Sequence, residues 1–521
     1  MPHLTHRAAG RGRTAGDMIR AMNSGGTAAM DEAAGKDTRS TRPLPLGAIV
    51  ALVALLAANW SLAAAWPNIL FSGSSLVLFG GLLLLLGRIS PAGLILLLPL
   101  VITRGATLVS LLVIEAGAYM PEVNRLGEPG DASASFLAFT ALFFLVFALV
   151  FRRLEATVLA YARAPLLDMV VAWLGWPVVL LCMALGGIAF LHGLQGGFPL
   201  LAGVDRFLYR REYSSGLVLI LLDNKFLFAA MLGAVAFAPR YQPLLKTAAI
   251  VAFLGLTGLY FLFGDKFFTI LAEVAFFAMP LLLTRQGRLA GTMLRLAVPV
   301  GALLCAALGA TLYIYSGYGR LPLDRTVTLV GERIAGQGEL WFIASRDARR
   351  MTNWDAHLVD RNIDTLGDKS PPASAFANGV ETYYFIERYS PSKLAASFRK
   401  NQGWVQLTMG TEAMALVMFG YAGVAVIMAL LGALVAFAAL YLRRAFESGF
   451  PLSLFFAVWT FLQIYFAVQQ ASLWSIAAPG QINRLLLFLT IEIALLAVNR
   501  GQIRSAWGRA RAATFSTGRH S

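Results

Sequence analysis

Apolar runs of about 20 residues recur from Leu46 to Val498, and they constrain the fold of this chain more than any other feature. Each run is long enough to cross a hydrocarbon core of about 30 Å as a helix. Hydrophobic residues make up 58% of the sequence and charged residues only 14%, roughly half the charge density of an ordinary globular chain. A soluble globular protein is therefore excluded, and the sequence predicts an all-α polytopic integral membrane protein.

About twelve transmembrane helices are expected from these runs. They are residues 46–65, 69–87, 92–117, 134–151, 167–192, 217–238, 247–264, 267–284, 291–315, 411–441, 452–471 and 483–498. The run 217–238 contains Asp223 and Lys225, and the run 411–441 is too long for one straight span. Either of these two could include a re-entrant segment.

Basic residues gather in alternate short connections between the predicted spans. These are Arg88, Arg152, Arg153, Arg240, Lys246, Arg285, Arg288, Arg443 and Arg444. Because Lys and Arg concentrate in cytoplasmic loops of membrane proteins, both termini are expected in the cytoplasm, with the chain in a bacterial inner membrane. The same bias accounts for the net charge of +15, so no nucleic-acid partner is expected.

The predicted organisation has five parts. They are a disordered cytoplasmic tail over 1–45, helices one to nine over 46–316, a large periplasmic loop over 317–406, helices ten to twelve over 407–498, and a basic cytoplasmic tail over 499–521. Cys182 and Cys305 both lie inside apolar runs, so neither a disulfide framework nor a cysteine metal motif is predicted. Protease, lipase and Walker-type ATPase motifs are also absent from the sequence. No metal or cofactor is expected, and energy would come from an activated substrate or a gradient.

The loop 317–406 is the one non-cytoplasmic segment long enough to form a substructure. It contains nine arginines, three lysines and ten carboxylates. Arginine has a planar guanidinium that binds phosphate in a bidentate manner, whereas lysine is a point charge. The excess of arginine favours anion binding, although individual arginines could equally form surface ion pairs.

One segment of this loop, GERIAGQGELWFIASRDARR, suggests a short helix. Gly336 and Gly338 interrupt the backbone, and the pattern from Glu339 onward is that of an amphipathic helix lying at the bilayer surface. Arg346 and Arg350 are four residues apart, so two guanidinium groups could bind one pyrophosphate. Alternatively, these arginines extend into lipid headgroups.

Two further segments place charge on the non-cytoplasmic side. The segment VDRFLYRREY brings Arg206, Arg210 and Arg211 close in sequence, which predicts either a second anion site or a salt-bridged interfacial helix. The turn at Asp265 and Lys266 joins two apolar runs. It could form the floor of an active site beneath the large loop, or it could be a simple turn with a charged tip.

Three residues are candidates for the base that removes a proton from a sugar hydroxyl. They are His357, which is near Asp355, and then Glu339 and Asp265. A solvent-exposed surface histidine is the competing interpretation for His357. Arg104 lies within the third predicted span with Glu115 eleven residues later; such buried charges suggest function, or else a structural pair with a neighbouring helix.

Taken together, about twelve spans, cytoplasmic termini and one large arginine-rich exported loop resemble the O-antigen polymerase family, which polymerises lipid-linked oligosaccharide repeat units. The local similarity rests on VDRFLYRREY, on the GDKF turn and on the arginine-glycine pattern from Arg325 to Gly336. The architecture is similar to that of glycosyltransferases of the C type. Unlike the related O-antigen ligases, the loop has His357 as its only histidine.

The resemblance implies a metal-independent, inverting glycosyl transfer at the periplasmic face. The donor would be the growing glycan on undecaprenyl pyrophosphate, and the acceptor a single lipid-linked repeat unit. The implied pyrophosphate- and glycan-binding residues are Arg206, Arg210, Arg211, Lys266, Arg325, Arg333, Arg346 and Arg350. The implied partners are these lipid-linked oligosaccharides, membrane lipids, a polysaccharide chain-length regulator and a flippase.

Two other functions stay open. A secondary transporter or lipid-linked glycan flippase would bring Arg104, Glu115, Asp223 and Lys225 together near the middle of the membrane. A processive glycosyltransferase of the shape-determining type would share the reaction class but use the peptidoglycan precursor.

Overall fold

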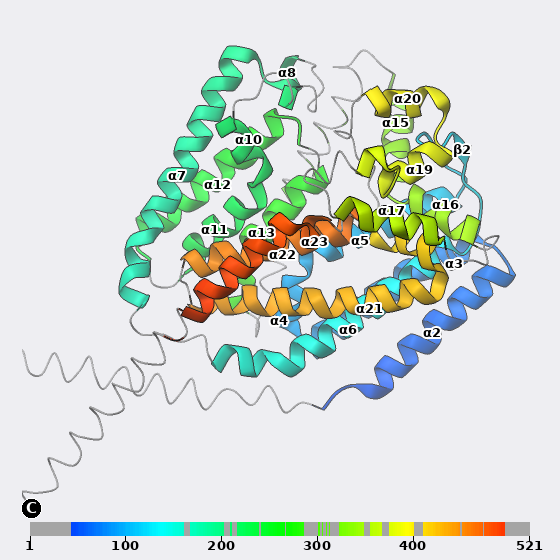
Figure 1. The fold of residues 1–521 in the computed structure, drawn as a ribbon, viewed down its shortest axis with the longest axis horizontal. Helices are drawn as coiled ribbons and strands as arrows, with labels where there is room; N and C mark the ends of the chain where they lie inside the picture. The colour runs from blue at the N-terminus through cyan, green and yellow to red at the C-terminus, as the bar shows by residue number, and fades with distance from the viewer. Residues whose placement is uncertain are drawn as a thin grey trace, which may run out of the picture. The chain divides into compact units, whose positions relative to one another are not determined.

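The structure is a computed structural model in which most helices of the chain are described (Figure 1). The described residues are 43–160, 167–202, 209–210, 216–238, 241–265, 267–285, 301–302, 305, 309, 312, 322–348, 355–366, 375–400, 410–448, 451–471, 474–494 and 497. Apart from residues 43–45, the predicted terminal tails 1–45 and 499–521 lie outside this set.

Helices dominate the described residues, with one short β-hairpin. The elements are α2 Leu46–Ala65, α3 Ile69–Ile89, α4 Pro91–Leu96, α5 Leu98–Glu115, β1 Tyr119–Met120, β2 Arg125–Leu126, α6 Ala132–Ala160, α7 Leu167–Gly196, α8 Pro199–Ala202, α10 Gly216–Asp223, α11 Lys225–Phe237, α12 Pro243–Leu262, α13 Phe267–Thr284, α15 Leu323–Ala335, α16 Glu339–Ala348, α17 Ala356–Leu366, α19 Thr382–Tyr389, α20 Ser392–Lys400, α21 Thr411–Ser448, α22 Pro451–Gln470 and α23 Trp474–Ala477. Strands β1 and β2 pair antiparallel within the connection after α5.

Eight helices among the described residues are long and apolar enough to cross a membrane. They are α2, α3, α5, α6, α7, α12, α21 and α22, and each falls on a predicted span. The bent pair α10 and α11 would make a ninth span, and residues 269–284 of α13 form a shorter apolar helix. The chain is therefore an α-helical, multi-pass membrane protein.

Two predicted spans are not represented among these helices. Residues 479–494 are helical and overlap the predicted span 483–498 over residues 483–494. The predicted span 291–315 lies outside the described residues except for five isolated positions.

Local sequence explains where several helices begin. The side chain of Asn68 accepts a hydrogen bond from the Leu70 amide at 3.0 Å and caps α3. Ser90 accepts one from the Gly93 amide at 3.1 Å and caps α4, with Pro91 at its first position. Side-chain oxygens satisfy amides that have no partner inside the helix, and proline at the first turn loses no hydrogen bond. The predicted span 92–117 is thus divided at Leu97 into α4 and α5, and Pro99 lies in the first turn of α5.

The two predicted spans with unusual sequence, residues 217–238 and 411–441, are irregular in the structure. The run 217–238 is broken into α10 and α11, which are bent by 66° at Asn224. The long helix α21 has one non-helical residue, Gly420, with φ 67° and ψ −174°. Glycine adopts this conformation without the steric cost that a Cβ imposes. The run 217–238 is therefore broken and the run 411–441 is kinked, while the prediction of a re-entrant segment in either of them stays a prediction.

Glycines allow two pairs of helices to approach closely. A Cβ atom at Gly432 of α21 would lie 2.5 Å from the carbonyl oxygen of Phe143 on α6. A Cβ atom at Gly233 of α11 would lie 2.2 Å from the carbonyl oxygen of Phe277 on α13. Small residues at helix crossings bring backbones into van der Waals contact, which is a main source of helix association in membranes.

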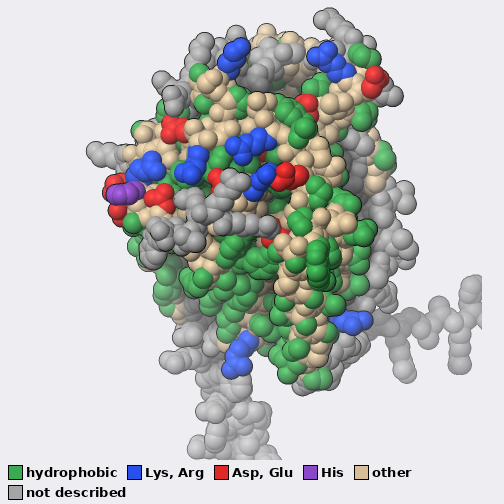
Figure 2. Space-filling view, turned by 90° about the vertical axis from the view of Figure 1, so that its right-hand side faces the viewer, with side chains coloured by type: hydrophobic (Ala, Val, Ile, Leu, Met, Phe, Trp, Pro, Cys, Tyr) green, Lys and Arg blue, Asp and Glu red, His purple; other side chains and the backbone are tan. Residues whose placement is uncertain are grey.

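Charged and apolar side chains separate on the molecular surface. Figure 2 shows acidic and basic side chains gathered in the upper part of one face, an apolar surface below them, and a few basic side chains at the lower edge. Leucines and valines of α2 and α3, such as Val50, Leu70 and Leu84, are exposed within the apolar helices. Such a surface suits contact with lipid chains.

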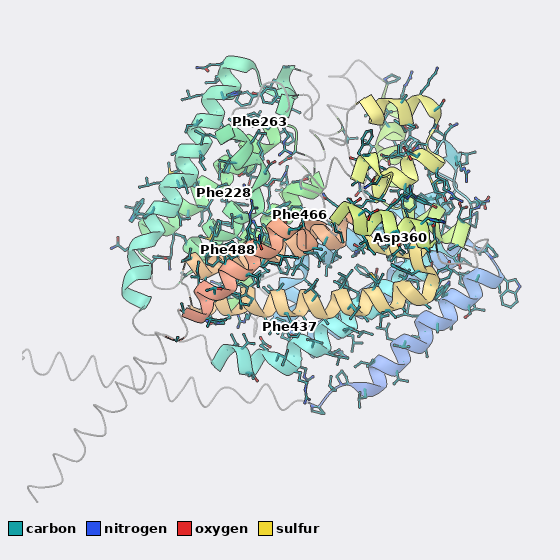
Figure 3. All side chains as sticks on the ribbon, viewed as in Figure 1. Phe228, Phe263, Asp360, Phe437, Phe466 and Phe488 are labelled. Carbon is teal, nitrogen blue, oxygen red and sulfur yellow. The ribbon has the colours of Figure 1, made fainter. Side chains whose placement is uncertain are left out.

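The segment predicted as the loop 317–406 is largely helical. It contains α15, α16, α17, α19 and α20, which we call the cap. Helix α16 packs against α5, α6 and α21, and α15 packs against α5. The cap is therefore joined to the spans by side-chain packing, and Asp360 on α17 marks its position (Figure 3).

Candidate functional site

The turn between α15 and α16 is bound to α5 by a single serine. The Ser110 hydroxyl donates to the carbonyl of Ala335 at 2.7 Å and accepts from the amide of Gly338 at 2.8 Å. A Cβ atom at Gly338 would lie 2.9 Å from the Ser110 oxygen and 2.9 Å from Leu111. The glycine that the sequence indicated as a backbone break is thus required for close approach of the cap to the membrane helices.

Helix α16 does not have the exposed face of a helix lying on a bilayer surface. All residues from Glu339 to Ser345 are buried, so the prediction of an amphipathic surface helix was wrong in this respect. The reason is that α16 contacts three spans at once, α5, α6 and α21, and together they leave none of these seven residues exposed. Only Arg346, Asp347 and Ala348 at its end are partly exposed.

Trp341 of α16 contacts the start of α6 through a hydrogen bond and ring packing. Its indole nitrogen donates to the carbonyl of Ala132 at 2.8 Å, and its ring packs edge-on against Phe136 and Phe139 with centroids 5.9 Å apart in both cases. Nearby, the indole nitrogen of Trp60 donates to the carboxylate of Asp131 at 3.0 Å. These aromatic side chains supply large buried area and satisfy their polar atoms, which fixes the orientation of α16.

Glu339 is a buried carboxyl at the base of the cap. It is fully buried, and neither of its oxygens has a hydrogen bond of good geometry. Burial, together with the nearby carboxylate of Glu122, raises the pKa of Glu339 from 4.5 to about 8, and the backbone amides of Glu122 and Val123 partly offset this rise. A carboxyl with such a pKa can take up or release a proton near neutral pH.

A cluster of tyrosines and charges links α16 to α19 and was missed at the level of sequence. The Tyr389 hydroxyl donates to the carboxylate of Asp347, and the Arg388 guanidinium donates to the Tyr384 hydroxyl at 3.0 Å. Arg388 also lies 5.7 Å from the centroids of the Tyr384 and Tyr389 rings. The run TYYFIERY was the available signal, because aromatic residues beside an arginine at helical spacing suit cation–π contact.

The predicted phosphate-binding arginines have different environments. Arg325 is exposed on α15. Arg346 forms an ion pair with Glu128 at 2.5 Å, with side chains 38% and 55% exposed. Arg210 pairs with Asp223 at 3.3 Å. The structure thus places Glu339 and Arg346 on one helix, whereas Arg210 belongs to the connection before α10.

Several predicted site residues cannot be placed. Arg206, Arg211, Lys266 and Arg350 lie outside the described residues, and the side chain of Arg333 on α15 is also outside them. Of the other candidate bases, His357 is exposed on α17, and Asp265 accepts a hydrogen bond from Lys225 at 2.6 Å. In the part of the chain that the structure describes, no group of three or more His, Cys, Asp or Glu side chains is arranged to hold a metal ion.

The four charged residues singled out within the spans, Arg104, Glu115, Asp223 and Lys225, have separate partners. Arg104 of α5 forms a buried salt bridge with Glu412 at the start of α21 and donates to the Val468 carbonyl at 3.1 Å. Glu115 accepts hydrogen bonds from the Ser72 hydroxyl at 2.6 Å and the Ser133 amide at 3.3 Å. Together with the Arg210–Asp223 and Lys225–Asp265 pairs, these contacts show four individual interactions and no shared centre among the described residues.

Comparison with known families finds one match to part of the chain. A family of unknown function (DUF6418) matches residues 378–483. This range includes α19 and α20 of the cap, the spans α21 and α22, and the short helix α23. A search of the curated proteins gave no match, and a search of the solved structures gave none.

Proposed function

We propose that this protein is a metal-independent glycosyltransferase that polymerises undecaprenyl-pyrophosphate-linked repeat units into a surface polysaccharide. The observation that carries this proposal is the docked pair α15 and α16. Arg325 lies on α15 and Arg346 on α16, and α16 begins with a buried carboxyl, Glu339, whose pKa is about 8. A polymerase of this kind needs these two functions, anion binding and proton transfer, at the membrane surface.

The arginines would act on the leaving group. A glycosyl pyrophosphate is already activated, and negative charge develops on the pyrophosphate as the glycosidic bond breaks. A well-placed cationic donor stabilises such charge by about 3 to 4 kcal/mol. Among the described residues Arg346 pairs with Glu128, and both side chains are partly exposed. Exposed pairs contribute little stability, so a pyrophosphate could replace this carboxylate at low cost.

Glu339 is the candidate base that the electrostatics favour. Asp265 is already engaged by Lys225, and His357 is exposed on the outer surface of α17. Glu339 has no exposed surface in this conformation, so its use as a base requires the adjacent β1–β2 turn to move when the acceptor glycan binds. The anomeric carbon of the donor glycan would bond to the acceptor oxygen as its bond to the pyrophosphate breaks, and undecaprenyl pyrophosphate would leave. The hydroxyl proton would pass to the ionised form of Glu339, which must first release its own proton because its pKa is about 8.

The surface pattern supports an orientation with the cap in the periplasm and both termini in the cytoplasm. Basic side chains without acidic ones occur at the lower edge of the face in Figure 2, and both signs occur around the cap. Cytoplasmic edges of membrane proteins are enriched in Lys and Arg. In this orientation a bacterial inner-membrane polymerase would receive substrates from a flippase, contact membrane lipids, and act with a chain-length regulator.

A transporter or flippase is the alternative, and it would bring Arg104, Glu115, Asp223 and Lys225 together near the middle of the membrane. Arg104, Glu115, Asp223 and Lys225 have different partners among the described residues. We therefore favour the polymerase.

The test is the glycan profile of a deletion strain complemented with the wild-type gene, Arg325→Ala or Arg325→Lys. The matched control is Arg125→Ala, which removes another exposed arginine from β2. We expect the wild type and the control to restore polymer. Arg325→Ala should leave single lipid-linked repeats on the periplasmic face, with the lysine variant in between because it lacks the bidentate contact. Repeats retained on the cytoplasmic face of the deletion strain would indicate a flippase, and an unchanged profile in that strain would refute both functions.

A further inference from the structure

Arg388, near the end of α19, is an exposed arginine of the cap that forms no salt bridge among the described residues. Its guanidinium donates one hydrogen bond there, to the Tyr384 hydroxyl at 3.0 Å. The central carbon of the guanidinium lies 5.7 Å from the centroid of the Tyr384 ring and 5.7 Å from that of the Tyr389 ring. Arginine has five N–H donors, so most of them are available to a ligand while two aromatic rings hold the group in place.

Tyr389 lies between this arginine and a carboxylate of another cap helix. Its hydroxyl donates to the Asp347 Oδ2 atom of α16 at 2.5 Å. The other oxygen of Asp347 has no hydrogen bond among the described residues, and both Asp347 and Tyr389 are partly exposed. Fully buried Phe385 supports the Tyr389 ring, with centroids 6.0 Å apart. A hydrogen-bond acceptor, several donors and an aromatic ring therefore meet at one exposed place where α16 contacts α19.

The run TYYFIERY explains why these groups are fixed in position. Tyr384 and Arg388 are four residues apart, as are Phe385 and Tyr389, so each pair shares one face of the helix. Tyr384 is only 7% exposed, and Phe385 and Ile386 are buried, which anchors α19 in the cap. Side chains that are already held in place lose little conformational freedom when a ligand binds.

The mixture of groups indicates which ligand would bind. A cationic and an anionic side chain contact the same tyrosine, so this place differs from a cluster of arginines that selects phosphate. A sugar ring has neighbouring hydroxyls, which can accept from the guanidinium of Arg388 and donate to the carboxylate of Asp347. It also has an apolar C–H face, which can pack on the exposed part of the Tyr389 ring, because tyrosine combines an apolar body with a polar end.

The position along α16 connects this place to the arginine already assigned to the leaving group. Asp347 directly follows Arg346, and consecutive Cα atoms are about 3.8 Å apart. On a helix their side chains diverge by about 100°, so Arg346 and Asp347 can contact different parts of one substrate. In a lipid-linked repeat unit the first sugar is bonded directly to the pyrophosphate, which matches this order.

We propose that Asp347, Arg388 and Tyr389 form a binding site for a sugar ring of the lipid-linked glycan, adjacent to its pyrophosphate. Asp347 and Arg388 form hydrogen bonds to the sugar hydroxyls, and Tyr389 packs on the C–H face. Tyr384 is a positioning residue, because its hydroxyl fixes the guanidinium of Arg388 without contacting the sugar. The assignment rests on the proposed function and specifies which part of the substrate the cap holds.

The experiment is isothermal titration calorimetry of the full-length protein in lipid nanodiscs with two separate probes. The first probe is a mixture of oligosaccharides obtained by partial acid hydrolysis of the surface polysaccharide of the host strain, which lack the lipid pyrophosphate. The second is inorganic pyrophosphate. The variants are Arg388→Ala, Tyr384→Phe and Arg346→Ala. Arg125→Ala, which removes another exposed arginine, from β2, is the matched control.

We expect Arg388→Ala to weaken oligosaccharide binding by about tenfold or more, because hydrogen bonds from a charged donor are lost, and to leave pyrophosphate binding unchanged. Tyr384→Phe keeps the ring and removes the hydroxyl that holds the guanidinium, so its loss of affinity should be smaller. Arg346→Ala should give the opposite pattern, with weaker pyrophosphate binding only. Arg125→Ala should bind both probes as the wild type does.

Three results would overturn the sugar site. They are a wild type that does not bind the oligosaccharides, an Arg388→Ala variant that binds them as tightly as the wild type, and an Arg388→Ala variant that loses only pyrophosphate binding. If Arg388→Ala does not fold, Tyr384→Phe and the isosteric Asp347→Asn replace it under the same criteria, since both keep the size of the side chain.

Failure of this site and failure of the proposed function give different results. An unchanged glycan profile in the deletion strain would refute the polymerase, whatever the cap binds. Oligosaccharide binding that depends on Arg388 in such a protein would still establish a glycan site on the cap. Normal polymer in a strain with a variant that has lost oligosaccharide binding would instead show that this site does not serve polymerisation, and would overturn its assignment to the substrate.

Discussion

Arg104 and Glu412, which are 308 residues apart in sequence, form a salt bridge in which both side chains are almost completely buried. The pair connects α5 to the first turn of α21, where the chain leaves the cap and re-enters the spans. The Thr411 hydroxyl strengthens this junction by donating to the Ala467 carbonyl of α22 at 2.5 Å. Three helices are thus held at one point by polar contacts.

Replacing one residue of this salt bridge should destabilise the protein more than replacing both. Loss of one partner leaves an uncompensated buried charge, so Arg104→Met and Glu412→Leu are each expected to cost about 3 to 5 kcal/mol, whereas the double variant should cost much less. The measurement is the thermal unfolding of the purified protein in detergent. Additive effects of the two substitutions would show that the side chains do not interact.

The approach of the cap to α5 depends on the absence of a side chain at position 338. Gly338→Ala would place a Cβ atom 2.9 Å from both Ser110 and Leu111, and we expect a destabilisation of about 1 to 3 kcal/mol. Gly331→Ala is the matched control, because a Cβ atom there meets nothing within 4 Å; alanine in that helix should be neutral or slightly stabilising. The measurements are the rate of limited proteolysis of the cap and the unfolding temperature of each variant. Equal values for Gly338→Ala and Gly331→Ala would argue against the docking of the cap on α5.

The close contact between α6 and α21 leads to a similar prediction for a glycine within the membrane helices. Gly432→Ala would direct a methyl group to 2.5 Å from the Phe143 carbonyl oxygen, and the helices would have to separate, at a cost of about 1 to 3 kcal/mol. Gly255→Ala on α12 provides the comparison, since nothing lies within 4 Å of its Cβ position. Unfolding temperatures in detergent are the readout. The crossing is refuted if Gly432→Ala is as stable as the control.

Stability should depend on pH through Glu339. Its pKa rises from 4.5 to about 8 on folding, so the folded state binds the proton more tightly than the unfolded state does. The favourable contribution is complete below about pH 4.5 and is lost as pH rises through about 8. This linkage is on the order of 4 to 5 kcal/mol. Unfolding temperatures measured between these pH values should fall with pH in the wild type.

The variant Glu339→Gln removes this titration and should flatten the profile over the same range. Glu128→Gln is the control, because that carboxylate is 55% exposed and its loss should leave the slope unchanged. A Glu339→Gln profile as steep as that of the wild type would mean that another group is responsible for the pH dependence.

Sequence alone predicted most of the spans because apolar runs of sufficient length have few alternatives to a membrane helix. It also indicated the irregular helices, since Asp223 and Lys225 interrupt an apolar run and α21 exceeds the thickness of a bilayer. The partners of the buried charges could not be predicted. Which residue neutralises Arg104, or which carboxyl pairs with Lys225, depends on contacts between helices that are distant in sequence.

The candidate site was predicted in part. The glycine break and the helix beginning at Glu339 are present, and His357 is exposed, as the competing interpretation of that residue expected. The burial of α16 was not predicted, because its polar residues suggested an outer face, and polarity along one helix cannot reveal how many neighbours surround it. The cluster of Tyr384, Arg388 and Tyr389 was missed although the run TYYFIERY carried a local signal, because the contact of Tyr389 with Asp347 joins helices that are 42 residues apart in sequence.

The docking of α15 and α16 through Ser110 has a consequence for protein engineering. The membrane part contributes the hydroxyl, and the cap contributes the carbonyl of Ala335 and the amide of Gly338. A cap transplanted from another protein would therefore need more than matching end points at the spans. The recipient helix that corresponds to α5 would need a serine at the position of Ser110, and the cap would need a glycine at the position of Gly338. The cap and the helix that accepts it therefore have to be exchanged together.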